Sequence, residues 1–335
     1  MTRTHDLPVA VRLLDQPHAD ARRLLATGAP VYLLVNPVEY HGPHLSLHND
    51  KVIALGLAHR LHASLQRTHP AWPLLLADDL EIGVDACPGP GTRHTSYAVA
   101  RTLVVDACRA LLELGARRVV LMTFHGSPLH AATLEAGVQT VRASGGAAYS
   151  PFNHVLAILA GMDTPAPFAP AVAGVDAAHR QRLLEKIPYD FHAGFFETSV
   201  ALALAPDTVS PIYRELPPCP PIPGDPRFLK LARGARSLGR AAFARECELV
   251  AAALGWNALR PFPGYTSEPA FASVEAGEAF VERIVDIYRA SADEVLSRGA
   301  PSPPPVLTWT RSLSLDGRFE AAPKPSAGDV LELVQ

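Results

Sequence analysis

Short apolar runs alternate with helical segments through the first 150 residues. Four runs are rich in aliphatic and β-branched residues, as buried parallel strands are, at 31–35, 73–78, 117–124 and 147–152. Helical periodicity separates them, at 50–67, 95–115 and 129–146. Alternation of this kind predicts an α/β fold with three layers, in which helices cover both faces of a mainly parallel central sheet.

Residues that favour helix ends stand at two of these boundaries. Asn49 or Asp50 is suited to cap the first helix, because either side chain can accept hydrogen bonds from free amides. Thr95 or Ser96 is suited to cap the second helix, and Gly115 to end it.

The second half is less regular. Residues 189–209 pass from a polar and aromatic segment into a helix, and long helices are expected at about 228–254 and 274–298. Three proline-dense patches favour extended connectors, at 165–174, 215–226 and 300–306.

We expect two parts in the chain. Residues 1–299 would form one domain, and residues 300–335 a proline-rich linker with a hairpin-like tail. The hairpin is expected because residues alternate around the turn pair Asp316–Gly317.

Composition excludes several classes of protein. Of the 335 residues, 48% are hydrophobic and 19% charged, so a sizeable core can form. A formal charge of −3 offers no basic face for nucleic acid, and no apolar run is long enough to predict a membrane span. The N-terminal segment lacks the apolar core of a signal peptide. The four cysteines form no C-x-x-C pair, which favours a cytoplasmic protein without disulfides or a zinc knuckle; they are Cys87, Cys108, Cys219 and Cys247.

The stretch "NPVEYHGPHLSLHND" (36–50) follows the first predicted strand and concentrates ionisable side chains. Glu39 and His41 are two residues apart, so an extended backbone points both to one side. Asp50 comes nine residues after His41, and a chain reversal could return it to the same point.

Further groups of the same kind come later in the chain. His125 follows the strand at 117–124, and "HAGFFETS" (192–199) contains His192 and Glu197. Functional groups of parallel sheets gather beyond the carboxyl ends of the strands. Imidazole and carboxylate together suit zinc, manganese or iron without a thiolate.

Each of these residues has an ordinary explanation when taken alone. Glu39 could be a solvated loop charge and Asp50 a helix cap. His44, His48 and His130 could be surface or capping residues, since the chain has 14 histidines. Their joint occurrence at two strand ends favours a metal site. "FHGSP" (124–128) also raises a nucleophilic role for Ser127, but it lacks the G-x-S-x-G elbow.

"EYHGPHLSLHND" (39–50) resembles the E-x-H-G-x-H-L-P-x-x-T-D motif of the creatininase family of metal-dependent amidohydrolases. Four further segments are similar to that family's motifs: "GPGT" (89–92), "FHGSP" (124–128), "HAGFFETS" (192–199) and "GYTSEPAFASVEAG" (264–277). The resemblance covers about residues 30 to 298.

The resemblance implies a site with two divalent ions, zinc in the first place or manganese or iron. Its metal ligands would be Glu39, His41, Asp50, His125 and Glu197, with Asp50 bridging the ions. A hydroxide activated by the metals would attack the amide carbon, and His192 would protonate the departing nitrogen. The substrate would contact His44, Thr92, Ser127 and Phe195.

The chain departs from the family at several positions. Ser127 stands where creatininase itself has a metal-binding glutamate, which favours Glu197 as the ligand. Asn49, Phe124 and Pro128 replace a family threonine, glycine and asparagine. Creatininase closes its pocket with tryptophans, whereas this chain has none between Trp72 and Trp256, which argues against creatinine as the substrate.

The expected activity is hydrolysis of a non-peptide or cyclic C–N amide bond in a small molecule. One alternative is a peptidase in the maturation of a peptide or cofactor. Another is a degenerate member of the family that binds a ligand or partner without turnover. The resemblance further implies a homo-oligomer, such as a hexamer.

Overall fold

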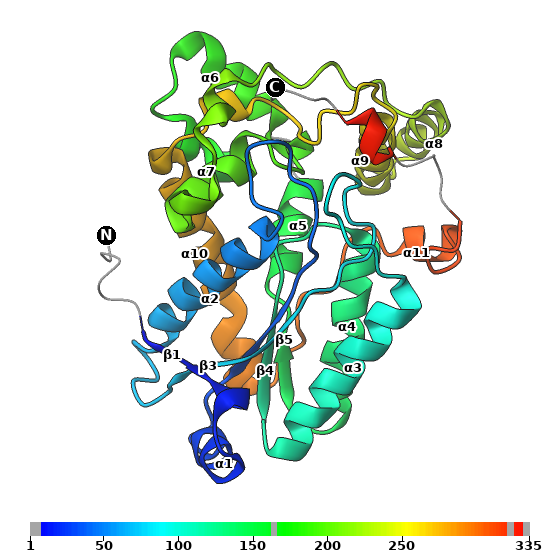
Figure 1. Ribbon diagram of the computed structural model, residues 1–335. Helices are drawn as coiled ribbons and strands as arrows, with labels where there is room; N and C mark the ends of the chain where they lie inside the picture. The colour runs from blue at the N-terminus through cyan, green and yellow to red at the C-terminus, as the bar shows by residue number, and fades with distance from the viewer. Residues whose placement is uncertain (1–7, 162–165, 320–324, 331–335) are drawn as a thin grey trace.

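Five strands form one all-parallel sheet in the order β1-β3-β2-β4-β5 (Figure 1). This computed structural model describes residues 8–161, 166–319 and 325–330. The strands are β1 (Ala10–Arg12), β2 (Val31–Val35), β3 (Leu74–Leu80), β4 (Arg118–Met122) and β5 (Ala147–Tyr149). The predicted parallel α/β fold is therefore confirmed, and the short edge strand β1 extends the sheet beyond the four predicted runs.

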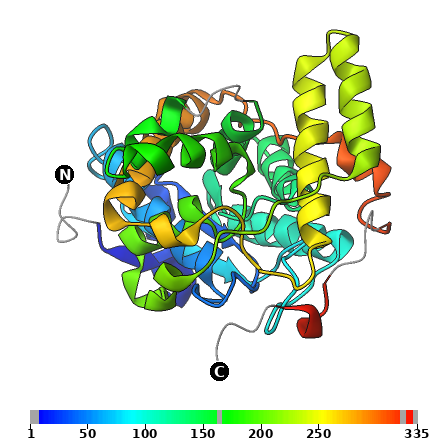
Figure 2. The same ribbon diagram turned by 90° about the horizontal axis from the view of Figure 1, so that it is seen from above.

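Helices surround this sheet and build a region above its carboxyl edge (Figures 1 and 2). They are α1 (His18–Ala26), α2 (Asn49–Leu65), α3 (Tyr97–Leu114), α4 (Pro128–Ala143), α5 (Phe152–Gly161), α6 (Ala177–Lys186), α7 (Phe195–Leu204), α8 (Pro226–Ser237), α9 (Ala241–Asn257), α10 (Val274–Arg298) and α11 (Trp309–Leu313). Within the described ranges, none of these helices has the length and apolarity of a membrane span.

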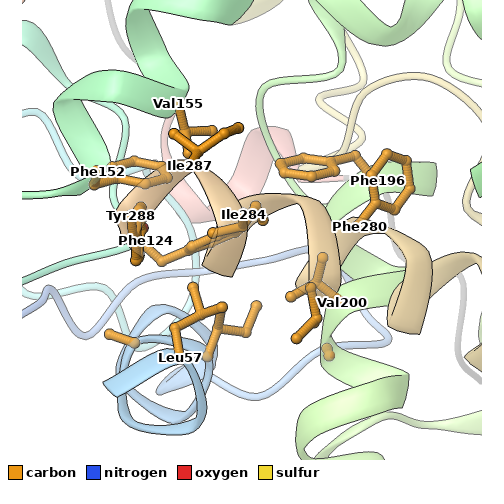
Figure 3. Close-up of a cluster of buried hydrophobic side chains, with 14 of the residues drawn as sticks. Leu57, Phe124, Phe152, Val155, Phe196, Val200, Phe280, Ile284, Ile287 and Tyr288 are labelled. Carbon is orange, nitrogen blue, oxygen red and sulfur yellow. The ribbon is translucent and has the colours of Figure 1, made fainter. Parts of the chain in front are cut away.

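The sheet is buried on both faces, which explains its unbroken apolar runs. In β2, Tyr32 and Leu34 join a core with α2, α5, α7 and α10. The alternate residues Val31, Leu33 and Val35 join a core with α1, α3 and α4 on the other face. Figure 3 shows the first core, where Phe196 of α7 meets Phe280 of α10. Two separate cores on one sheet make the predicted three layers.

Helix boundaries were predicted correctly for α3 but not for α2. Ser96 caps α3 by accepting a hydrogen bond from the Val99 amide, and Gly115 ends that helix with φ of 123°. The caps proposed for α2 are wrong, because this helix begins at Asn49 and no side chain caps it. Asn49 and Asp50 are buried instead.

The single helix expected at 228–254 is wrong. Residues 238–240 break it into α8 and α9, and Gly239 adopts a left-handed φ of 72° that glycine accepts without strain. The two helices pack as a hairpin that projects from the body (Figure 2). The helix expected at 274–298 is confirmed as α10.

The hairpin expected around Asp316–Gly317 is also wrong in the described part of the tail. Helix α11 and a series of turns occupy residues 309–319, and residues 320–324 lie outside the described ranges. Trp309 packs on Phe228 and Phe243, and its Nε1 donates to Glu246 at 2.7 Å. These contacts hold the tail against the α8–α9 hairpin.

Candidate metal centre

The carboxyl ends of β2, β3 and β4 lie side by side, and the loops that follow them build the site. Asn36, the first residue after β2, ties two of these loops together. Its Nδ2 donates to the Met122 carbonyl at 3.4 Å, and its Oδ1 accepts from the Phe124 amide at 3.0 Å. The segment before α7 then brings later residues to the same edge.

All six residues proposed as ligands or proton carrier come together, and none is more than 7% exposed; they are Glu39, His41, Asp50, His125, His192 and Glu197. The centre of the cluster is His41, whose Nε2 lies 3.3 Å from Glu197 Oε1, 3.4 Å from Asp50 Oδ1 and 3.5 Å from Glu39 Oε1.

The other two histidines both approach Glu39. His125 Nδ1 lies 3.3 Å from Glu39 Oε1 and 3.7 Å from Asp50 Oδ2. His192 Nδ1 lies 3.7 Å from Glu39 Oε1, and its ring stacks on that of His41 with 4.4 Å between centroids. Three overlapping sets of ligand atoms result, each compact enough to hold an ion.

Each histidine uses its second nitrogen to bond a backbone carbonyl. These pairs are His41 Nδ1 with Glu39 O at 3.0 Å, His125 Nε2 with Val84 O at 2.9 Å and His192 Nε2 with Tyr40 O at 2.8 Å. A carbonyl only accepts, so the bonded nitrogen carries the hydrogen. In the neutral ring, the nitrogen that faces the cluster then has a free lone pair, as a metal ligand requires.

Two polar atoms in the cluster have no hydrogen-bond partner in the described structure, namely His41 Nε2 and Asp50 Oδ2. Buried polar groups are almost always satisfied, so both atoms call for an additional partner. Three imidazoles and three carboxylates form a donor set that suits zinc or manganese. The residues therefore fit a bound divalent metal.

Neighbouring amides fix the carboxylates. Glu39 Oε2 accepts from the Cys87 amide at 2.8 Å, and Glu197 Oε1 accepts from Asn49 Nδ2 at 2.9 Å. The Ala193 amide donates to Glu197 Oε2. Asn49 is thus an orienting residue, a role that the capping prediction missed.

The charges of the cluster shift one another's pKa values. Burial would lower the pKa of His125, but the Glu39 carboxylate outweighs burial and raises it to about 9. The pKa of His41 lies well above its usual value in spite of burial, because Glu197 and Asp50 face it. Burial would raise the pKa of Glu197, but the charge of His41 lowers it to about 2. A cation that enters the cluster therefore competes with protons.

A second group of residues shapes the segment that carries His192 and Glu197. Asp190 Oδ2 accepts from the Phe196 amide at 2.9 Å, and Thr266 Oγ1 donates to Asp190 Oδ1 at 3.1 Å. A Cβ on Gly194 would lie 1.8 Å from Asp190 Oδ1, so only glycine fits there. Asp190 and Thr266 were not among the predicted site residues. The signals available for them were the closeness of Asp190 to the "HAG" motif and the place of Thr266 in the segment 264–277.

A cavity of about 650 Å³ opens beside the cluster, with Glu39, Asp50, His125, His192 and Glu197 in its lining. Ser127, one of the four proposed substrate contacts, also lines it. Its Oγ donates to Asp85 Oδ2 at 3.2 Å and accepts from the His130 amide at the start of α4.

The structure places the other three proposed contacts outside the cavity lining. Phe195 is fully buried against Phe280 in the core, and the adjacent Phe196 lines the cavity instead. Thr92 bridges the Tyr40 amide and the Cys87 carbonyl, at 2.9 and 2.7 Å. His44 Nε2 bonds Thr198 Oγ1 at 2.9 Å. These three residues support the walls of the site.

The fold and the cluster together define the class of this protein: it is an α/β protein with a candidate metal centre at the carboxyl edge of a parallel sheet. The chain matches the creatininase family, described as creatinine amidohydrolase, over residues 15–291. It belongs to that family, as the sequence motifs indicated.

Similar proteins agree with this assignment. A mycofactocin precursor peptide peptidase from Mycobacterium ulcerans (strain Agy99) is 30% identical over 199 residues, which are 56% of this chain and 63% of that protein. The match thus spans less than two thirds of that relative. A creatinine amidohydrolase structure is 23% identical and covers 87% of this chain and 98% of its own, with a TM-score of 0.55. A structure described as creatininase Mn is 22% identical and covers 87% and 99%, with a TM-score of 0.54. At these identities the structures show the shared fold.

Proposed function

We propose that this member of the creatininase family hydrolyses a non-peptide or cyclic C–N amide bond at a centre of two divalent ions. Zinc is the first choice for these ions, and manganese and iron are the alternatives. The observation that carries the proposal is the buried cluster at the base of the cavity. There His41 Nε2 and Asp50 Oδ2 face several ligand atoms and have no hydrogen-bond partner in the described structure.

The cluster offers two ligand sets that share only Asp50. One consists of Glu39, Asp50 and His125, and the other of His41, Asp50 and Glu197. Asp50 turns Oδ1 toward His41 at 3.4 Å and Oδ2 toward His125 at 3.7 Å, as a bridging carboxylate would. When bound, the ions would polarise the amide carbonyl and lower the pKa of a water.

His192 is the proposed proton carrier. Its Nε2 hydrogen is held by the Tyr40 carbonyl, which leaves Nδ1 as the atom that exchanges a proton. Burial and the charge of His41 lower the pKa of His192, so the ring is neutral near pH 7. Nδ1 can then accept a proton from the attacking water and deliver it to the departing nitrogen.

Metal analysis and an amide screen test this proposal together. Glu39→Gln is expected to lose bound metal. His192→Ala is expected to keep the metal and to lose turnover by about 10²- to 10⁴-fold. His48→Ala is the matched control, because that histidine lies in the same segment but pairs with Glu81 away from the cluster. Zinc or manganese below one equivalent per loaded chain would refute the proposed centre. Full activity in His192→Ala would refute the assigned proton transfer.

Peptide hydrolysis is the second candidate function. It is favoured by the likeness to the mycofactocin precursor peptide peptidase and by a cavity larger than a small cyclic amide needs. Cyclic amides, formamides and short peptides should be screened side by side with the metal-loaded protein. Turnover of peptides alone would favour the second candidate over the first.

A further inference from the structure

The cavity continues well beyond the candidate metal centre, along a wall of apolar side chains. We infer that this wall is a specificity subsite for a bulky aromatic or aliphatic group attached to the scissile amide. This inference rests on the proposed function and goes beyond it, because it defines the part of the substrate that does not react.

Three separate parts of the chain build the apolar wall. Helix α5 contributes Leu156 and Leu159. The apolar residues from helix α9 and from the tail are Leu249, Val250, Ala253, Leu254, Val306, Leu307, Trp309, Leu313 and Phe319. The α8–α9 hairpin and α11 lie next to each other at one side of the molecule (Figure 2). The wall is therefore made by segments outside the strand-end loops that hold the metal cluster.

Aromatic side chains connect the cluster to this wall. The ring centroid of Phe124 lies 5.0 Å from that of Phe152 and 5.8 Å from that of Phe196. All three rings line the cavity. The same rings belong to the first core (Figure 3). Because core packing fixes them, this part of the subsite is formed before a ligand binds, which lowers the entropy lost on binding.

The charged groups of the lining outside the cluster already have partners. Asp85 accepts from Ser127, Asp190 accepts from the Phe196 amide and from Thr266, and Arg227 donates to Asp225 at 2.8 Å. Among the neutral polar groups of the lining, Thr310 and Ser314 donate to backbone carbonyls, and Asn257 is a further polar residue. A polar substituent placed against the aliphatic and aromatic side chains of the wall would lose its hydration without comparable partners. The chemistry of the wall thus selects an apolar group.

The volume of the cavity and the exposure of its apolar side chains also favour an apolar substituent. Small-molecule sites usually enclose about 300 to 1,000 Å³, and the cavity here holds about 650 Å³. A small ring amide seated on the cluster would leave most of the wall uncovered. Leu313 and Phe319 at the tail remain 60% and 65% exposed, and an apolar substituent would cover such side chains.

Two hydroxamic acids test the inference by calorimetry on the manganese-loaded protein. Acetohydroxamic acid and 4-phenylbutyrohydroxamic acid share a metal-binding head, and only the second carries an apolar group. The phenyl probe is expected to bind about 10- to 100-fold more tightly, because its ring and chain leave water for the wall. An equal affinity for the two probes would overturn the inference and leave the metal centre standing.

Two variants of the wall sharpen the test. Ala253→Phe fills the cavity from α9 and is expected to remove most of the gain of the phenyl probe. Leu249→Ala removes wall surface and is expected to weaken the phenyl probe by about 3- to 10-fold. Ala242→Phe, an exposed position on the same helix, is the control and should leave both affinities unchanged.

The outcomes separate the subsite from the metal centre. Binding of the phenyl probe that depends on Ala253 and Leu249, without any binding of acetohydroxamic acid, would support the subsite and contradict the metal centre. A phenyl gain that none of the wall variants reduces would overturn the subsite. Loss of self-association in Ala253→Phe, together with no phenyl gain in the wild type, would also overturn it and assign the wall to an interface between copies.

Discussion

Removal of the metal is expected to make this fold less stable as the pH rises from 6.5 to 9. In the metal-free cluster, Glu39 and Asp50 hold a proton on His125 and raise its pKa from 6.5 to about 9. The folded state then binds this proton more tightly than the unfolded chain does. The resulting stability is fully present below pH 6.5 and is lost progressively as the pH rises toward 9.

The size of the effect follows from the pKa of His125. A change from 6.5 to about 9 corresponds to on the order of 3 kcal/mol of unfolding free energy. For a chain of 335 residues, that loss should lower the Tm by about 4 to 5 °C. His41 adds to the loss in the same direction, because its pKa also lies above the usual value. Burial raises the pKa of Asp50 only to about 6, so its effect is largely complete before this window.

Calorimetric or fluorescence melts of chelated and metal-loaded protein between pH 6 and 9 measure this effect. The chelated protein should melt at lower temperature as the pH rises. The loaded protein should not, because a metal requires neutral imidazoles. His125→Gln in the chelated form should show a weaker pH dependence. A Tm of the chelated wild type that stays constant or rises from pH 6.5 to 9 would refute the reasoning.

Three further predictions concern the support of the cluster. Asp190→Ala removes the acceptor of the Phe196 amide and of Thr266, so we expect a loss of about 1–3 kcal/mol in a denaturant melt together with weaker metal binding. Gly194→Ala should be markedly destabilising, because its Cβ would overlap Asp190. Its matched control is Gly234→Ala on α8, where a Cβ meets open space and the protein should be unchanged or up to about 1 kcal/mol more stable in the same melts. Asn49→Ala frees Glu197 Oε1, and a metal titration should show about 10- to 100-fold weaker binding; an unchanged affinity would contradict its orienting role.

The sequence predicted the central sheet well because its strands are buried on both faces. A strand such as β4 shows that burial as an unbroken apolar run. The edge strand β1 has three residues and leaves no such signal. The break between α8 and α9 depends on Gly239, and one glycine in a helical pattern does not reveal whether the helix ends there.

The residues of the site were predictable as types but not in all their roles. Spacing and strand ends brought His41 and His125 to one edge, because parallel strands share the direction of their carboxyl ends. Asn49 was misassigned because a residue at a helix start can cap its own helix or reach across to Glu197, and only the fold decides between them. The choice between Phe195 and Phe196 for the cavity depends on how α7 is rotated against α10.

The three histidines are held by main-chain carbonyls, those of Glu39, Tyr40 and Val84. A substitution at Val84 or Tyr40 changes a side chain but leaves the accepting oxygen in place. The hydrogen bonds that orient the imidazoles therefore do not depend on the side chains at those two positions. A relative with another side chain at Val84 can therefore keep the direction of the ring nitrogens, and a comparison of such sites should weigh the backbone path as well as the residue types. Tyr40 is more constrained, because its buried ring packs against Gly89 and Gly264.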